Sequence, residues 1–470
     1  MKRIISFLSA LSLLGILTGC TDSNSGNSII DDPEINDMFF GLSDPSAWTL
    51  ASVPADPLLF PESSLINNDE SNNNRAWLSW YTVDRLFTQG NSAYAPDYIK
   101  NDMDALSYPY AREVTLTEVF PLKEINYGES SLVHTLNLSF YPRERGPYNL
   151  DAKNIDQEGN LLYPEIRWGG IMRKIDDNNF EQADIDCIEF WLLDPFMDPE
   201  LDNRDGGYLY FNLGDVSEDV LKDGLLSYEN GLPIDGDDTY VTYTAWGKVS
   251  NLIPSSYAFN YRGAILQDVG LDGLSNQEEA HHPAYAHFLN ELHNALSETT
   301  IIAMHNDPFS PFNDPAGDDY AYYRHAYYDI QRFPINSRYK HYNGTDGNSF
   351  SKNDASDAQY RQARSTPDAE DINHSFTLDN NERFFQYRIV LHPDSMQVGR
   401  NYITDLRVAN VHTRNGGIQQ ATWYEFTIPL AHYERTVGSI HDFSDIRFIR
   451  MFMTGFRGIT HLRFATLELR

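Results

Sequence analysis

Alternation of apolar and polar residues marks several segments of the chain as β-strands. Leu132–Phe140 places its leucines on one face, and Leu209–Leu213 alternates leucine and phenylalanine with tyrosine and asparagine. This period of two is typical of a half-buried strand. Ile185–Leu193 is apolar on both faces apart from two acids and is expected to be a central strand. Further strands are expected at 114–120, 385–391, 424–430, 447–456 and 462–469.

Helical spacing is strongest between His281 and Leu296, where Tyr285, Phe288 and Leu292 fall on one face. A short helix capped by Asp215 or Ser217 is also expected, ending at Leu221.

Long connections between strands of one kind favour a Greek-key or jelly-roll sandwich over a simple meander. The predicted fold is therefore a mainly β, jelly-roll or Greek-key-like β-sandwich that is discontinuous in sequence and carries an α-containing insertion. The expected divisions are a signal peptide (1–20), a polar tether and extended segment (21–74), a first β part (75–254), an insertion with a helix and a calcium-like loop (255–373), and a C-terminal β part that completes the sandwich (374–470).

The net charge changes the list of possible partners. The chain has 35 Lys and Arg against 68 Asp and Glu, a formal charge of −33. Such a surface repels phosphates, so nucleic-acid binding is disfavoured, whereas cations such as calcium are suited to it.

The first twenty residues have the form of a signal peptide. Lys2 and Arg3 precede an apolar run, Ile4–Leu17, that is too short to span a membrane comfortably. The run leads into Leu-Thr-Gly-Cys20, which looks like a bacterial lipobox, so lipidation of Cys20 is expected; the alternative is an ordinary secretory signal with a chance cysteine. Thr21 follows the cysteine instead of Asp, which favours the outer membrane. Whether the protein would face the periplasm or the cell surface stays open.

Removal of the signal leaves Cys187 as the only cysteine. It sits in an apolar run, so a buried, inert thiol is expected there.

A calcium-loop pattern precedes the predicted helix. Counted from Asp268, it has carboxylates at positions 1, 5 and 12, glycine at 6 and an amide at 9, the spacing by which oxygen ligands surround a hard cation. The candidate ligands are Asp268, Asp272, Asn276 and Glu279. Gly270 at position 3 leaves one ligand missing. An acidic turn that caps the helix without metal is an equally good interpretation.

Other groupings favour structural explanations. The acids at 307, 314, 318, 319 and 329 could add oxygen ligands but have no fixed spacing, so a solvated loop is expected. His281, His282, His287 and His293 lack the zinc-protease spacing, and His287 with Glu291 forms an ordinary helix pair. Nucleophile-elbow, P-loop, dinucleotide and kinase motifs are absent from the sequence, and no carboxylate pair can be singled out for glycoside hydrolysis. The chain is therefore not expected to be an enzyme.

Several ordered motifs carry a family resemblance. RWGGIM, IEFWLLDPF and LYFNLGDVSEDVLKDG, followed by QDVGLDGLSNQEE, DPAGDDYAYYRHAYYD and TPDAEDIN, resemble segments of the SprA/Sov family in the same order. That family is the outer-membrane translocon of type IX secretion and also serves gliding motility. The resemblance extends from about Arg75 to Arg470 and covers one internal region of the family, outside its membrane barrel.

The resemblance implies a lipid-anchored SprA-like module that binds protein partners of the secretion and motility apparatus, with no catalytic residues. Two alternatives stay open: a glycan-binding surface lipoprotein with a jelly-roll domain, and a truncated SprA paralogue without function.

Overall fold

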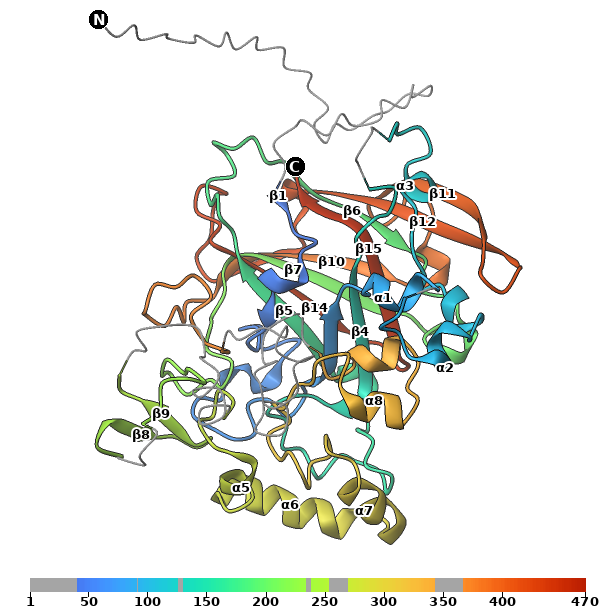
Figure 1. Cartoon of the computed structure of the whole chain (residues 1–470). Helices are drawn as coiled ribbons and strands as arrows, with labels where there is room; N and C mark the ends of the chain where they lie inside the picture. Colours follow the sequence, from blue (N-terminus) through green and yellow to red (C-terminus); the bar gives the residue numbers. More distant parts are fainter. Residues whose placement is uncertain (1–39, 91, 126–129, 234–237, 253–268, 343–366) are drawn as a thin grey trace, which may run out of the picture.

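Two antiparallel β-sheets form the centre of the computed structural model, which describes residues 40–90, 92–125, 130–233, 238–252, 269–342 and 367–470 (Figure 1). The first sheet has seven strands in the order β11-β12-β6-β15-β4-β3, with β1 pairing with β15 off this path. Its strands are β1 Phe40–Gly41, β3 Ala76–Tyr81, β4 Leu136–Arg145, β6 Cys187–Leu193, β11 Ile403–His412, β12 Ile418–Pro429 and β15 Thr460–Leu469.

The second sheet has six strands in the order β13-β10-β7-β14-β5-β2. Its strands are β2 Thr49–Leu50, β5 Trp168–Lys174, β7 Gly207–Asp215, β10 Arg383–Leu391, β13 Arg435–Val437 and β14 Phe448–Thr454. A separate two-stranded sheet joins β8 Val241–Tyr243 to β9 Lys248–Ser250.

Strands from distant parts of the chain alternate within each large sheet. β6 lies between β12 and β15, and β7 lies between β10 and β14. The central strand of each sheet thus comes from the first half of the chain, while its neighbours come from the last ninety or so residues. Neither half of the sequence contains a complete large sheet.

The two sheets pack through apolar side chains, with Phe190 of β6 at the centre. Its ring stacks on Phe426 with centroids 4.7 Å apart, meets Phe464 at 5.4 Å, and faces Phe211 of the second sheet at 5.9 Å. All four side chains are fully buried. The mainly β, sandwich-type fold predicted from the sequence is therefore confirmed.

Helices gather at one end and one side of the sandwich (Figure 1). They are α1 Arg85–Thr88, α2 Asp97–Lys100, α3 Leu116–Val119, α5 Asn276–Glu279, α6 Pro283–Ala295, α7 Glu298–His305 and α8 Ala326–Ile330. α6 buries Tyr285, Phe288 and Leu292, the face predicted from their spacing. Within the described residues, the helices all fall short of the length and apolarity that a membrane crossing requires.

The strand predicted at 114–120 is wrong, because residues 116–119 form α3. Its β-branched residues favour a strand, but Glu118 faces the protein interior and accepts two hydrogen bonds from Arg112, at 2.8 and 2.6 Å. Trp423 of β12 donates a third, at 2.9 Å. These tertiary contacts outweigh the local propensity.

The short helix predicted to end at Leu221 is also absent. Its backbone N–H groups are taken by distant acceptors: Ser217 donates to the Glu382 carboxylate at 2.8 Å, and Glu218 to the Asp379 carbonyl at 2.7 Å. Asp215, the expected cap, instead pairs with Arg383 and Arg447. The segment is held extended across its neighbours.

Cys187 is buried, as expected from its apolar surroundings. It is not a free thiol, however: the structure places it in a disulfide, and the described residues contain no free cysteine.

We predict that His461 gives the fold a measurable sensitivity to acid. Burial lowers the pKa of His461 to about 4, and its Nδ1 lies 2.7 Å from the Ser139 hydroxyl. Between pH 6.5 and 4 the unfolded chain binds a proton that the folded chain excludes, so this group lowers the free energy of unfolding as the pH falls. The effect should approach 3 kcal/mol near pH 4, since one pKa unit is worth about 1.4 kcal/mol.

Urea unfolding of the wild type and His461→Gln at pH 7 and pH 4.5 isolates this term, because glutamine does not titrate. The variant should lose less stability between the two pH values than the wild type. His412→Gln, at an exposed position of β11, is the control and should behave as the wild type. Equal losses in all three proteins would contradict the prediction.

Candidate metal centre

Two buried carboxylates and a half-buried one converge in the α-containing region. Asp272, Glu279 and Asp318, called here the first carboxylate cluster, each place one oxygen within 4.8 Å of the others. Asp272 is 1% exposed and Glu279 is 0% exposed.

Asp272 is positioned by the turn that precedes α5. One of its carboxylate oxygens accepts a hydrogen bond from the Leu274 N–H at 2.9 Å, and the other accepts one from the Tyr285 hydroxyl of α6. Gly270 lies two residues earlier with φ +62°, where a side chain would collide with the Asp318 carboxylate. The glycine therefore lets Asp318 approach the turn closely.

Glu279 is the last residue of α5, whose first turn is fixed by a capping box between Ser275 and Glu278. Its Oε2 accepts a hydrogen bond from the Ala316 N–H at 2.8 Å, while its Oε1 is buried and has no partner. Oδ2 of Asp318 is likewise buried without a partner.

The loop carrying Asp318 is tied down by Asp314 and Arg145. The Asp314 carboxylate accepts hydrogen bonds from the N–H groups of Gly317 at 2.8 Å and Asp318 at 3.2 Å. Arg145, from the end of β4, donates to the carbonyls of Pro315 at 2.8 Å and Asp314 at 3.2 Å. These hydrogen bonds hold the loop in place.

Burial, and then repulsion between neighbouring acids, disfavours the charged forms of the carboxylates in the first cluster. Burial raises the pKa of Asp272 to about 7. Burial, followed by the charges of neighbouring acids, raises the pKa of Glu279 and of Asp318 well above the usual range. Removing water from a carboxylate is costly unless a cation or hydrogen bonds replace it, so this cluster is suited to a bound cation.

The sequence-predicted ligands are placed as follows. Asp272 and Glu279 come together in the cluster, whereas Asp268 lies outside the described residues. Asn276 points its amide N–H₂ at the Asn313 carbonyl, 2.8 Å away, and at the Asp319 carboxylate, 2.7 Å away. Asp318 completes the cluster from a loop remote in sequence.

The expectation that the downstream acids form a solvated loop is wrong for Asp314 and Asp318. Asp314 is 1% exposed, and Asp318 belongs to the cluster. Asp307 fits the expectation, because it is exposed, and Asp329 pairs with Arg338 at 2.7 Å. The density of acids was the available signal, but no spacing distinguished Asp318 from its neighbours.

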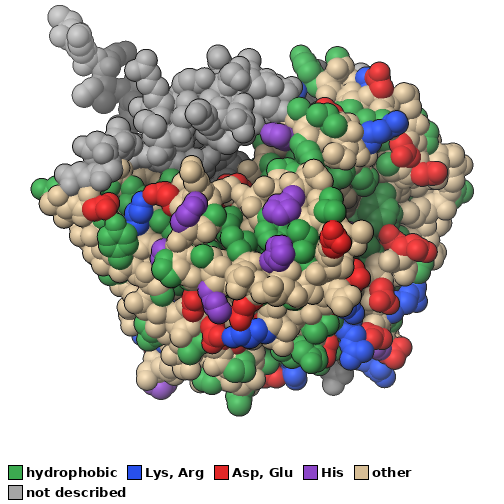
Figure 2. Space-filling view, turned by 90° about the horizontal axis from the view of Figure 1, so that it is seen from below, with side chains coloured by type: hydrophobic (Ala, Val, Ile, Leu, Met, Phe, Trp, Pro, Cys, Tyr) green, Lys and Arg blue, Asp and Glu red, His purple; other side chains and the backbone are tan. Residues whose placement is uncertain are grey.

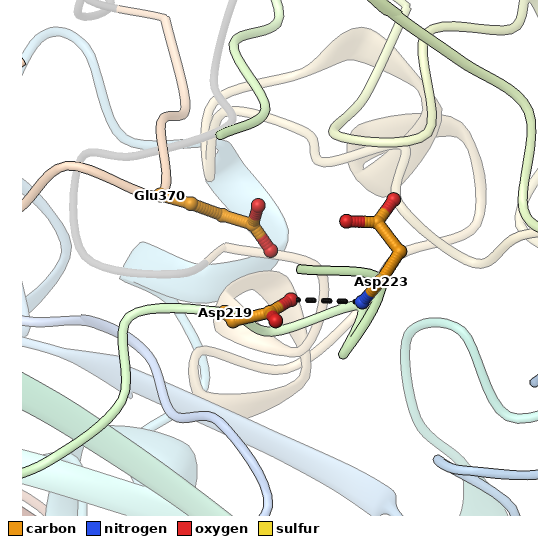
Figure 3. Close-up of side chains that lie close together, drawn as sticks. All are labelled: Asp219, Asp223 and Glu370. Atoms are coloured by element: carbon orange, nitrogen blue, oxygen red, sulfur yellow. Dashed lines mark hydrogen bonds between the residues drawn. The ribbon is translucent and has the colours of Figure 1, made fainter. Parts of the chain in front are cut away.

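A second carboxylate cluster, which sequence reasoning missed, consists of Asp219, Asp223 and Glu370 (Figure 3). Asp219 accepts hydrogen bonds from the N–H groups of Asp223 at 3.1 Å and Gly224 at 2.9 Å. The Glu370 carboxylate accepts three more, from the following donors: Val220 at 2.7 Å, Leu221 at 3.0 Å and Ser227 at 3.1 Å.

Backbone donors thus satisfy the two buried acids of the second cluster, and Asp223, the third, is only half-buried. Burial raises the pKa of Asp223 to about 6 and that of Glu370 well above its usual range. The hydrogen bonds of this cluster hold residues 219–227 against the segment that carries Glu370. The first carboxylate cluster, with unpartnered buried oxygens, is the better candidate for a metal centre.

Histidines do not take part in either cluster. Figure 2 shows histidines at several places on the face that carries α5, α6 and α7, some of them beside acidic and basic side chains. His287 Nε2 lies 3.5 Å from Glu291 Oε1, as the helix-pair interpretation predicts.

The protein is thus a sandwich of two antiparallel sheets with an α-containing region, and this region holds the first carboxylate cluster. Residues 287–470 match the model of the SprA_N family, described as motility related/secretion protein. Over these residues the match confirms the family resemblance predicted from the sequence, and it indicates a motility- or secretion-related protein. A comparison with curated proteins finds no match.

The matched region is not a structural unit. It contains β10 to β15 and Asp318, whereas β6, β7, Asp272 and Glu279 precede it. In both sheets the matched strands are separated by a strand from outside the match.

We predict that residues 287–470 alone do not fold, because β12 and β15, and likewise β10 and β14, lack the strand that joins them. The isolated fragment should show no cooperative thermal or urea transition. Co-expression with residues 40–286 should yield a complex that unfolds cooperatively, and the uninterrupted chain 40–470 serves as the control. A sigmoidal unfolding curve for the fragment alone would refute the prediction.

Proposed function

We propose that this protein is a lipid-anchored component of a type IX secretion and gliding motility apparatus, and that it works by binding other proteins. The family match over residues 287–470 is the observation that carries the proposal. Motifs in the family's order, which reach back to Arg75, support it over a longer stretch.

The proposed anchor is a lipid on Cys20, which follows the basic and apolar segments of a signal peptide. These residues lie outside those that the structure describes. The chain has only two cysteines, and the structure places Cys187 in a disulfide, so a lipid on Cys20 and an intrachain disulfide are competing states.

We predict that the protein isolated from membranes incorporates labelled fatty acid and that Cys20→Ser abolishes this incorporation. Cys187→Ser is the control and should keep the lipid label. A wild-type protein that carries no lipid label would contradict the anchor.

Binding, as opposed to catalysis, is favoured by the form of the carboxylate clusters. Glu370, Asp219 and Glu279 are buried and accept hydrogen bonds from backbone N–H groups, an arrangement that holds loops in place. The long, exposed edge of the first sheet offers a surface for a protein partner.

That edge is β11, which pairs with β12 on one side and ends the sheet on the other. The β11–β12 hairpin protrudes from the body of the protein (Figure 1). Leu406 and Val408 are 36% and 50% exposed on one face of β11. An unpaired strand edge can accept an extended segment of another protein by main-chain hydrogen bonding. The occupant that we propose is such a segment from a component of the apparatus.

We predict that Leu406→Lys with Val408→Lys weakens cargo export and surface spreading of the native bacterium about as much as gene deletion does, while the melting temperature stays within a few degrees of the wild type. Ile302→Lys, on exposed α7, is the matched control and should leave both activities intact. A photo-crosslinker at Val408 should capture a named secretion or motility component.

Unchanged export and spreading after deletion of the gene would overturn the proposal as a whole. Binding on a glycan array by a protein whose deletion leaves export unchanged would favour the sugar-binding alternative.

A further inference from the structure

We propose that Asp272, Glu279 and Asp318 bind one calcium ion, which fastens the 314–319 loop to the turn and helix at 270–279. The inference rests on the geometry of these residues and is independent of the proposed role in secretion.

The spacing of the three carboxylates suits a shared ion. Oxygen ligands of calcium lie 2.3–2.6 Å from the metal, so two ligands of one ion are separated by at most about 5 Å. The three acids each provide an oxygen within 4.8 Å of the others.

Two of the oxygens point to a missing partner. Glu279 is 0% exposed, yet its Oε1 has no hydrogen bond, and Oδ2 of Asp318 is buried without one. Buried polar atoms are almost always paired, and those left over call for an explanation such as an ion. In the second carboxylate cluster, backbone donors already satisfy Asp219 and Glu370, and only Oδ2 of Asp223 is buried without a partner.

Side-chain cations do not supply the missing charge. Arg145 is buried nearby, but its hydrogen bonds go to the carbonyls of Asn149, Asp314 and Pro315. Lys248 pairs with Glu278, which lies on the partly exposed side of α5. The first carboxylate cluster therefore concentrates negative charge in a dry site.

The donor set selects the metal class. All three ligands are carboxylates, without histidine or cysteine, which favours a hard cation over zinc or copper. Calcium accepts irregular geometry and six to eight oxygens, whereas magnesium requires a near-ideal octahedron and retains most of its water. The site combines a helix end with a loop about forty residues away, so a metal of flexible geometry fits it better.

The expected consequence is a clamp between two parts of the chain. Ala316 already bonds to Glu279 and to the Tyr148 N–H, and Tyr148 lies at the end of β4. An ion at the cluster would strengthen this junction between the α-containing region and the sandwich.

The test uses the mature chain, residues 21–470, freed of metal with a chelator and titrated with calcium chloride by isothermal calorimetry. One calcium ion should bind per chain. The Kd should be about 10⁻⁴–10⁻³ M, as in extracellular calcium modules, or lower. At ten times the Kd the melting temperature should rise by about 1–3 °C. Magnesium at the same concentration should produce a smaller rise.

Isosteric variants identify the ligands. Glu279→Gln and Asp318→Asn should each lose calcium binding at least tenfold, and each should raise the melting temperature of the metal-free protein because one repelling charge is gone. Circular dichroism verifies that both remain folded. Asp223→Asn and Glu370→Gln, in the second carboxylate cluster, are the matched controls and should bind calcium as the wild type does.

Two results would overturn the inference. One is the absence of binding heat together with an unchanged melting temperature up to about 5 mM calcium, above the range of extracellular modules. The other is calcium binding that persists in Glu279→Gln and Asp318→Asn but disappears in the second-cluster variants.

Discussion

Packing of β6 against β7 is the interaction on which the rest of the fold depends. Phe190 and Phe211 bring the centres of the two sheets together, and each strand is flanked on both sides by strands from the C-terminal region. Loss of either strand would divide its sheet into two unpaired halves and expose their edges. A family match confined to residues 287–470 therefore describes where sequence similarity is detectable, and the folded unit is larger.

The excess of acids imposes a second constraint. With 68 acids and 35 basic residues, the chain cannot pair every carboxylate with a cation. Its buried arginines serve particular junctions: Arg450 bonds to Glu382 at 2.8 Å, and Arg167 to Asp151 at 3.0 Å. Other buried acids rely on backbone N–H groups, as Glu370 does. Neither kind of donor reaches Glu279 Oε1, and it is at this oxygen that we propose an external cation.

Periodicity carried much of the fold prediction, because a strand with one buried face must alternate. It located β7, β10 and β12, and the continuous apolar run located β6 as a central strand. It failed at 114–120, where Glu118 turns inward to Arg112, and at 215–221, where distant carboxylates replace helical hydrogen bonds. Both failures involve long-range polar contacts, which leave no period in the sequence.

Only the part of the candidate site that is local in sequence could be predicted. Asp272 and Glu279 are close in sequence and follow a recognisable loop spacing, so they could be selected together. Asp318 and the entire second carboxylate cluster are assembled by the fold: Asp219 and Glu370 are 151 positions apart in the chain. No local rule connects them.

The alternation of early and late strands also bears on when the protein becomes compact. β6 and β7 are synthesised long before β10 to β15, so neither can be enclosed until the end of the chain has emerged. Such long-range pairing is slow to form. A chain of this kind stays open until its last strand is available and becomes compact only then. The order of strands thus delays compaction until the whole chain has been made.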